Sequence, residues 1–389
     1  MNSPRTVIRS GIIGTGGIAH AHADAIASLP GRMSLVAVAD IDADRAAGFA
    51  ASHGEVAVHA DADGLLHSGS IDLVHICTPP QTHAALAIQA MRAGVVALVE
   101  KPTALSLAEI DEIARVQAET GVPTFTVFQH RFGPAVRHLR RLVAEGVLGR
   151  PLVATCETLW YRTDDYFAVP WRGRWNIEGG GPTMGHGIHQ FDVLLSVFGP
   201  WSEVTAVAER MLRPTDTEDV SAAVVRFANG AVATVMNSLV SPRETSRLRF
   251  DFEYASVEVE HVYGYSTDDW TFTPAAGHEV LAERWAEVAA SEEPSSHRDQ
   301  FAEIAAALGA GEQPGVAIDE ARRTLEFAAA TYASAFRRTP IAAGQIEGDD
   351  PFVTDMSGGM VPWSPIKPAS TPTPQASIKP KASIKEEQR

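Results

Sequence analysis

Residues 7–29, which read VIRSGIIGTGGIAHAHADAIASL, decide the fold of this chain. The apolar run from Val7 to Ile13 predicts a buried strand, and the pattern from about Ile18 to Leu29 predicts a helix. Residues 14–19 join them as G-x-G-x-x-A, in which the first Gly permits a tight turn and the second lets the backbone approach a pyrophosphate. This succession predicts a dinucleotide site. Its predicted cofactor-binding residues are Gly14, Thr15, Gly16, Gly17 and Ile18.

A second apolar run, from Ser34 to Ala39, ends at Asp40, about 20 residues after the Gly-rich turn. A carboxylate at this place accepts hydrogen bonds from a ribose diol and repels a 2′-phosphate. We therefore expect Asp40 to bind the cofactor and to favour NAD over NADP. The alternative is that Asp40 only caps a helix that begins near Asp42.

The rest of the first 130 residues repeats the pattern of strand followed by helix. Further strands are expected at Ile71–Cys77, Val95–Val99 and Thr124–Phe128, with helical patterns between them. Continuous apolar strands that alternate with helices indicate a parallel, doubly wound α/β sheet, a Rossmann domain. We expect this NAD-binding domain to span residues 1–130.

From residue 131 to 345 the pattern predicts an α+β domain built on a largely antiparallel open sheet. Asn229-Gly230 is a strong hairpin signal between two of its strands. The expected strands are Leu152–Tyr161, Val204–Arg210, Val220–Phe227, Ala231–Val240, Ser246–Phe252 and Ala255–His261, and the expected helices are Gly187–Val197, Arg298–Leu308 and Asp319–Arg338. The last segment, residues 346–389, is rich in Pro, Lys and Ser, and is expected to be a disordered tail.

Composition excludes several classes of protein. Asp and Glu number 48 against 32 Lys and Arg, a net charge of −16, which argues against binding to nucleic acid or to an anionic membrane. No apolar stretch is long enough to span a bilayer, and residues 1–10 do not resemble a signal peptide. Two cysteines form no disulfide framework, and no Cys/His spacing matches a metal site. We expect a cytoplasmic protein without a metal.

Lysine is used almost nowhere before the tail. Of five lysines, four lie in residues 367–389, and Lys101 is the fifth. A genome that favours Arg explains the scarcity of Lys, but it does not explain the exception. An Arg cannot exchange a proton near neutral pH, whereas a Lys amine can. Lys101 follows the strand Val95–Val99, at the carboxyl edge where parallel sheets bind ligands, so it is a candidate for chemistry beside the nicotinamide.

Together these residues resemble the Gfo/Idh/MocA oxidoreductase family over roughly residues 6–340. The resemblance rests on the Gly-rich turn, on Glu100-Lys101-Pro102, and on three glycines that lead through His189 to Asp192. Its remaining motif residues are Thr78, Pro79, Pro80 and His83, and the three glycines are Gly179, Gly180 and Gly181. The resemblance implies that Thr78, Pro79, His83, Glu100 and Lys101 contact the cofactor.

The resemblance also implies a catalytic Lys at Lys101 and a catalytic His at His189. The family has an Asp four residues before this His, but the position here is Gly185. His186, three residues before His189, would share a helical face with it and could take over the missing polar role. Alternatively, the two histidines only line the pocket or cap the helix. Trp171 and Arg172 suit a sugar ring and its hydroxyls, although a packed loop explains them equally well.

The predicted function is transfer of hydride between NAD and a hydroxyl or carbonyl carbon of a sugar, glycoside, inositol or related polyol. The resemblance also implies a homo-oligomer, either a homodimer or a homotetramer. Two other functions stay open: hydrolysis of glycosides with NAD used only transiently, and regulation by a nucleotide-binding protein without activity.

Overall fold

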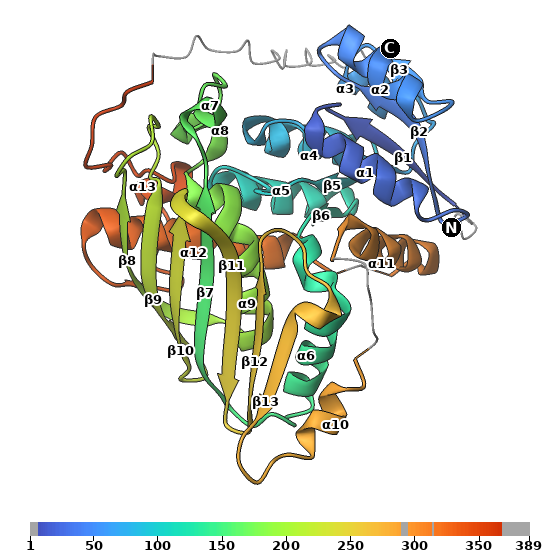
Figure 1. Ribbon diagram of the computed structural model, residues 1–389. Coiled ribbons are helices and arrows are strands. Elements are labelled where there is room, and N and C mark those ends of the chain that lie inside the picture. The colour runs from blue at the N-terminus through green and yellow to red at the C-terminus, as the bar shows by residue number, and fades with distance from the viewer. Residues whose placement is uncertain (1–6, 289–294, 313–314, 368–389) are drawn as a thin grey trace, which may run out of the picture.

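The computed structural model describes residues 7–288, 295–312 and 315–367. Two sheets organise these residues, a six-stranded sheet in the N-terminal part and an eight-stranded sheet in the C-terminal part (Figure 1). Helices cover both faces of the first sheet, whereas the helices of the second sheet lie behind it in this view. No helix among the described residues is long and apolar enough to cross a membrane.

The first sheet is parallel throughout and has the strand order β3-β2-β1-β4-β5-β6, which confirms the predicted Rossmann fold. Its strands are β1 (Ile8–Ile13), β2 (Met33–Ala39), β3 (Ala57–His59), β4 (Leu73–Ile76), β5 (Val96–Val99) and β6 (Thr124–Thr126). Its helices are α1 (Gly17–Ala27), α2 (Ala43–Ser52), α3 (Ala62–Leu66), α4 (His83–Arg92) and α5 (Leu107–Thr120). The sequence did not predict β3, a short and partly exposed edge strand without a continuous apolar run.

The second sheet has the order β13-β12-β11-β7-β10-β9-β8-β14, and only β7 and β10 pair in parallel. The predicted, largely antiparallel sheet is therefore confirmed. Its strands are β7 (Pro151–Tyr161), β8 (Trp201–Glu209), β9 (Val220–Phe227), β10 (Val232–Ser238), β11 (Val240–Phe252), β12 (Ala255–His261), β13 (Trp270–Pro274) and β14 (Ile341–Ala342). Gly230, at φ 90°, makes the predicted hairpin between β9 and β10. The unpredicted strands β13 and β14 are short edge strands.

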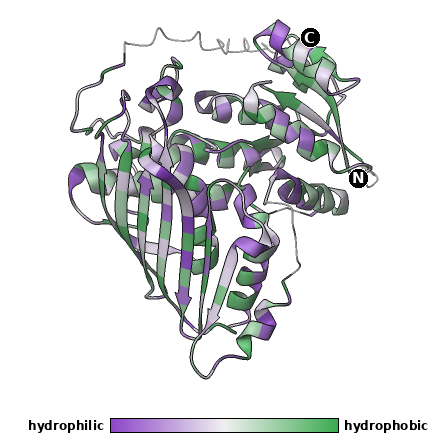
Figure 2. Ribbon diagram, viewed as in Figure 1, coloured by the Kyte–Doolittle hydropathy of each residue, from purple (hydrophilic) through white to green (hydrophobic). Residues whose placement is uncertain are grey.

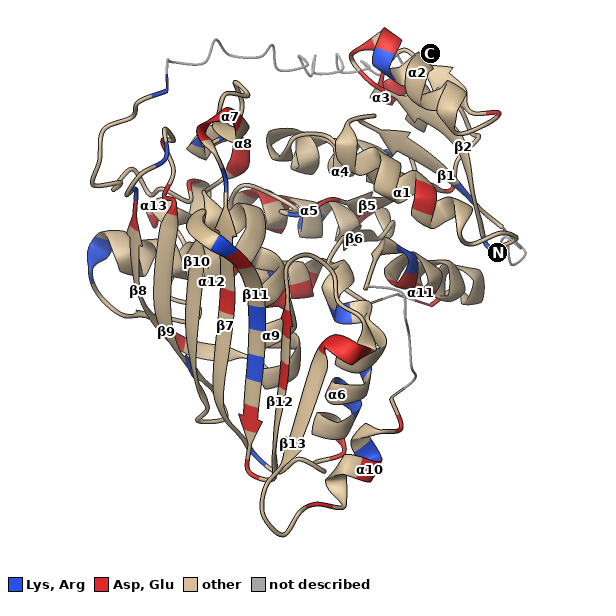
Figure 3. Cartoon of the chain, in the orientation of Figure 1, with Lys and Arg blue, Asp and Glu red and all other residues tan. Residues whose placement is uncertain are grey.

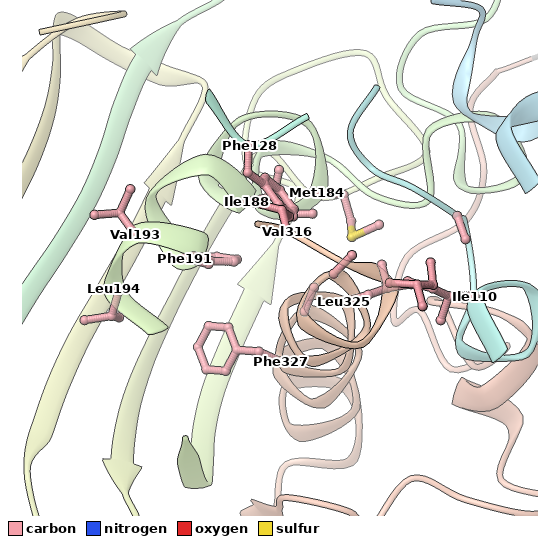
Figure 4. Packing of buried hydrophobic residues seen from close by; sticks show 14 of the residues in the cluster. Ile110, Phe128, Met184, Ile188, Phe191, Val193, Leu194, Val316, Leu325 and Phe327 are labelled. Carbon is pink, nitrogen blue, oxygen red and sulfur yellow. The ribbon is translucent and has the colours of Figure 1, made fainter. Parts of the chain in front are cut away.

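The inner face of this sheet packs on helices that hold the candidate site. Figure 4 shows Phe191 of α9 (Ile188–Phe198) facing Phe327 of α12 (Ile318–Arg337), with their ring centroids 5.1 Å apart. Met184 and Ile188 continue the same buried cluster toward the N-terminal domain. The other helices of this part are α6 (Pro134–Ala144), α7 (Asp164–Phe167), α8 (Trp175–Glu178), α10 (Leu281–Trp285), α11 (His297–Ala310) and α13 (Pro351–Thr354).

The outer face of the eight-stranded sheet is divided into two regions. Along the strands, hydrophobic and hydrophilic residues alternate, as expected for a sheet with one buried face (Figure 2). Charged residues gather on β11 and β12, where Arg247 pairs with Glu258 at 2.8 Å (Figure 3). On β8, β9 and β10 the outward side chains include the exposed Val207, Val224 and Met236.

Two segments differ from the predicted domain organisation. Residues 346–367 do not belong to a disordered tail: α13 is ordered, Phe352 is fully buried, and Trp363 donates to the carbonyl of Asp216 at 2.8 Å. The prediction of disorder was wrong for these residues because the Pro-, Lys- and Ser-rich composition of the whole segment hid the few apolar side chains that are buried here. Residues 368–389 lie outside the described residues. Helix α11, which comes after residue 131, packs on α1 of the N-terminal sheet through Phe301 and Ile304 (Figure 1).

Candidate active site

The Gly-rich turn has the geometry of a dinucleotide cradle. The N–H of Gly14 donates to the carbonyl of Ala39 at 2.8 Å, which joins the ends of β1 and β2. Gly14 has a φ of 87°, and a Cβ there would lie 2.8 Å from Thr78 and 2.9 Å from the backbone of Cys77. Beside Gly16 and Gly17, by contrast, no described atom lies within 4 Å of where a Cβ would be. This space, at the N-terminus of α1, suits a pyrophosphate.

Asp40 ends β2 as predicted, and it is ionised. Its carboxylate accepts from the N–H of Thr15 at 2.7 Å and from the Arg45 guanidinium at 2.6 and 3.1 Å. These bonds outweigh the effect of burial and lower the pKa of Asp40 to about 2. The side chain of Asp42 caps α2 by accepting from the N–H of Arg45. Asp40 also accepts from the N–H of Asp42, at 2.9 Å, so it contributes to the start of this helix, and its contact with the cofactor stays a prediction.

Thr78, Pro79 and His83 follow β4 at the same sheet edge. The ring of His83 is buried, and its nitrogens lie 2.7 Å from the carbonyl of Pro102 and 2.8 Å from that of Thr78. His83 therefore braces the turns that follow β4 and β5, because both its nitrogens are engaged with the backbone. Sequence reasoning had assigned it to the cofactor, since a motif does not show which partner a ring nitrogen takes.

The side chain of Glu100 is also engaged within the protein. Its Oε1 lies 2.9 Å from Nε2 of His22 and 3.4 Å from Nε2 of His297, and Nδ1 of His22 lies 3.0 Å from His75. The contact with the cofactor that the sequence predicts for Glu100 stays a prediction, because this side chain is bound to the two histidines. Among the described residues, His22, Glu100 and His297 have ligand atoms within 4.8 Å of one another, a spacing that the sequence hid because the three are far apart in the chain.

Lys101 follows β5 and reaches across to the C-terminal domain. Its Nζ donates to the carbonyl of Gly185 at 2.8 Å. Removal from water lowers the pKa of Lys101, the carboxylates of Glu100 and Glu178 oppose this effect, and Arg172 adds to it. An amine with a lowered pKa at this sheet edge can exchange a proton with a bound alcohol.

His189 lies in the first turn of α9 and stacks on His130. The ring centroids are 4.8 Å apart and the planes differ by 13°. Both rings are buried, and none of their four nitrogens has a hydrogen-bond partner in the part of the chain that the structure describes. Burial holds the pKa of His189 well below its usual range, so the ring is neutral and can accept a proton or donate one N–H.

His186 does not share a face with His189. It lies in η3 (Thr183–Gly187), a π-helical turn that precedes α9, so the α-helical spacing of three residues does not apply. Its ring packs edge-on against Trp160 at 5.0 Å. His186 and Gly185 line a small hollow, with a cavity volume of about 10 Å³, between η3 and the loop that carries α7 and α8. The other residues that line the hollow are Tyr166, Phe167, Gly173, Glu178, Gly180, Gly181, Thr217 and Leu239.

The predicted substrate residues Trp171 and Arg172 lie on the loop above this hollow. The guanidinium of Arg172 stacks over Tyr166 at 4.0 Å and over Trp171 at 4.3 Å. It also lies 3.5 Å from Glu178. Neither Trp171 nor Arg172 lines the hollow, whereas Tyr166 and Glu178, which sequence reasoning missed, do. The only sequence signal for Glu178 was a lone acidic residue directly before three glycines.

Asp192 is fully buried, three residues after His189, and has a structural role. Its carboxylate forms a bidentate pair with Arg131, with Nε to Oδ2 at 2.6 Å, and both side chains are buried. Arg131 also reaches Glu320 of α12 at 3.1 Å. Because Arg131 adjoins His130 and Asp192 follows His189 by less than one helical turn, this pair holds the two stacked rings in register.

Two family models match the chain. The model of an oxidoreductase family with an NAD-binding Rossmann fold matches residues 8–128, and the model of the GFO/IDH/MocA C-terminal domain matches residues 136–258. A scyllo-inositol 2-dehydrogenase (NAD(+)) of Bacillus subtilis is 31% identical over 60% of this chain and 68% of its own length. A D-apiose dehydrogenase of Paraburkholderia graminis is 26% identical over 91% of this chain and 94% of its own length.

One solved structure with a similar fold is the WlbA dehydrogenase of Bordetella pertussis in complex with NADH and UDP-GlcNAcA. Its TM-score is 0.79 at 25% identity, and the match covers 88% of this chain and 99% of that one.

Proposed function

Because this chain belongs to the Gfo/Idh/MocA family of oxidoreductases, we propose that it is an NAD-dependent dehydrogenase or reductase of a sugar, glycoside, inositol or related polyol. One observation carries the proposal: Lys101 leaves the cofactor edge of the Rossmann sheet and places its amine on the carbonyl of Gly185, at the hollow. The similar proteins named above, which act on inositol, apiose or a nucleotide sugar, support this substrate class.

When bound, NAD supplies a carbon that accepts or returns hydride at the substrate carbinol. The chain's own residues provide the remaining parts of the reaction. Gly14 makes the tight turn, Gly16 and Gly17 would leave room for the pyrophosphate, and Asp40 would accept a hydrogen bond from the ribose. Lys101 takes the hydroxyl proton during oxidation and returns it during reduction, while the neutral ring of His189 hydrogen-bonds the same oxygen.

Aromatic and basic side chains around the hollow suit a polyhydroxylated ring. Trp160 and Tyr166 offer flat faces, and Arg172 presents a guanidinium stacked on Tyr166. Glu178, which lies 3.5 Å from Arg172, is an acceptor for hydroxyl groups. We propose that these groups, with His186, bind the substrate.

The experiment that tests the proposal is a panel of sugars, glycosides and inositols offered with NAD and then with NADP. We expect the absorbance of reduced nicotinamide to rise with at least one polyol and NAD. NAD that binds without reduction by any substrate would contradict the proposal in favour of a regulator. Release of free sugar from glycosides without net reduction would favour the hydrolase.

We predict that Asp40 sets the preference for NAD. Replacing Asp40 with Ser removes a charged acceptor from the ribose site, and we expect the KM for NAD to rise about 10-fold or more while the KM for NADP falls. Steady-state kinetics with both cofactors measures this change. Asp44→Ser is the matched control, since Asp44 is an exposed acidic residue in the first turn of α2, and it should leave the ratio unchanged. An unaltered ratio in Asp40→Ser would contradict the assignment.

We also propose that the apolar part of the outer face is the interface of a homodimer or homotetramer. Val207 is 59% exposed, Val224 51% and Met236 40%, and no described helix covers them. Adjacent exposed apolar side chains of this kind mark an association surface.

A charge in this surface should separate the subunits. We expect Met236→Glu to shift the sedimentation coefficient to that of a monomer, whereas Val280→Glu, at an exposed position directly before α10, should not. If Met236→Glu sediments like the parent, the interface lies elsewhere.

We further propose a cytoplasmic location, with which the two free, buried cysteines agree.

A further inference from the structure

Glu178 lines the same hollow as Gly185, whose carbonyl accepts from Lys101, and sequence reasoning assigned it no role. It is the last residue of α8, and its side chain is 17% exposed. The N–H of Gly173 donates to its carboxylate, which fixes the side chain over the hollow that Gly185 and His186 also line. The guanidinium of Arg172 lies 3.5 Å from it. Burial raises the pKa of Glu178, and the N–H of Gly173 and the charges of Arg172, Lys101 and Lys367 oppose this effect.

Lys101 has no carboxylate in direct contact at its amine. Within the described residues, the hydrogen-bond partner of Nζ is the carbonyl of Gly185. The charged and titratable groups around the amine are Glu100, Glu178, Arg172, His83, His130, His186 and His189. Both carboxylates raise the pKa of Lys101. Glu100 is bound to His22 and His297, whereas Glu178 lines the hollow together with Gly185.

We propose that Glu178 is the positioning carboxylate of this site, which keeps Lys101 available as an ammonium and directs it toward the substrate oxygen. The inference rests on the proposed dehydrogenase function. In alcohol oxidation the proton passes from the hydroxyl to the amine, and Glu178 stabilises the ammonium that forms. In carbonyl reduction Glu178 stabilises the ammonium that donates the proton.

The space beside Gly185 provides a second way to test the coupling between Glu178 and Lys101. A Cβ on Gly185 would meet no described atom within 4 Å, and its φ is not in the left-handed region. A carboxylate at position 185 would therefore be tolerated next to the carbonyl that already binds Lys101. Gly185→Asp can then replace the charge that Glu178→Gln removes.

The experiment measures the pKa of Lys101 directly in the full-length protein. Only the neutral amine reacts with acetic anhydride, so the rate of acetylation of the Lys101 peptide, followed by mass spectrometry against pH, reports this pKa. Glu178→Gln removes a charge that raises the pKa, so we expect it to fall by about one pH unit. Gly185→Asp in the same chain should restore it, and Arg172→Gln should raise it. Glu119→Gln, exposed on α5, is the control.

The acidic limb of the kcat/KM profile for oxidation should move to lower pH in Glu178→Gln and return in the double variant. An unchanged Lys101 pKa in Glu178→Gln, relative to Glu119→Gln, would overturn the proposal. If the pKa of Lys101 moves but the kinetic profile does not, Lys101 is not the base. The electrostatic coupling between Glu178 and Lys101 would still be supported by that result. If Glu178→Gln fails to fold, the opposite shift in Arg172→Gln and a fall in Glu178→Asp decide the matter.

Discussion

Lys101→Met should bind NAD with unchanged affinity and lose activity by about 10²- to 10⁴-fold. The thioether occupies the volume of the amine stem but has no proton to exchange. Nothing in the Gly-rich turn or at Asp40 depends on this side chain, since the Nζ bond runs to Gly185 in the other domain. NAD binding by calorimetry and turnover under saturating substrate separate the two effects.

Lys101→Arg is the matched variant for this test. It keeps a positive charge at the end of β5, but a guanidinium cannot give up its proton near neutral pH. We therefore expect Lys101→Arg to be as inactive as Lys101→Met. Activity within tenfold of the parent in either variant would refute the role of Lys101 as proton acceptor.

Asp192→Ala should lower the free energy of unfolding by about 3–5 kcal/mol. It leaves the guanidinium of Arg131 buried with only Glu320, which is 28% exposed, as a partner. The midpoint of thermal unfolding should fall by roughly 10 °C for a loss of this size. Activity should fall with it, since the pair aligns His130 with His189.

A double variant distinguishes a buried unpaired charge from lost packing. Arg131→Met combined with Asp192→Leu removes both charges, and its loss of stability should be smaller than that of Asp192→Ala alone. The exposed pair of Arg115 with Glu112 is the reference, and Arg115→Ala should leave the free energy of unfolding almost unchanged. An Asp192→Ala protein as stable as Arg115→Ala would contradict this account.

Short sequence patterns, such as an apolar run or a Gly-rich turn, predicted the strands and helices that are buried along most of their length. The strand from Val7 to Ile13 and the helix after it are within one or two residues of β1 and α1, because an apolar run and a Gly turn are both local. The strand β3 and the ordered segment around Phe352 could not be found in this way, since their order comes from contacts with distant parts of the chain.

In the candidate site, too, local sequence signals found some residues, whereas contacts between distant parts of the chain determine the others. Lys101 was found because its residue type is rare and the topology fixes the end of β5. The neighbours that set its chemistry, Glu178 and the stacked His130, are brought to it by the loop and by the pairing of Arg131 with Asp192. Sequence spacing also misjudged His186, because it assumes an α-helix where the chain forms a π-helical turn.

The most direct test of the central claim is a crystal structure of the protein with NAD bound. The account predicts the pyrophosphate on Gly16 and Gly17 and the nicotinamide beside Nζ of Lys101, with space for a substrate oxygen about 3 Å from the amine. A nicotinamide bound elsewhere, or a Lys101 amine that points into solvent on the far side of the β5 edge, would contradict it.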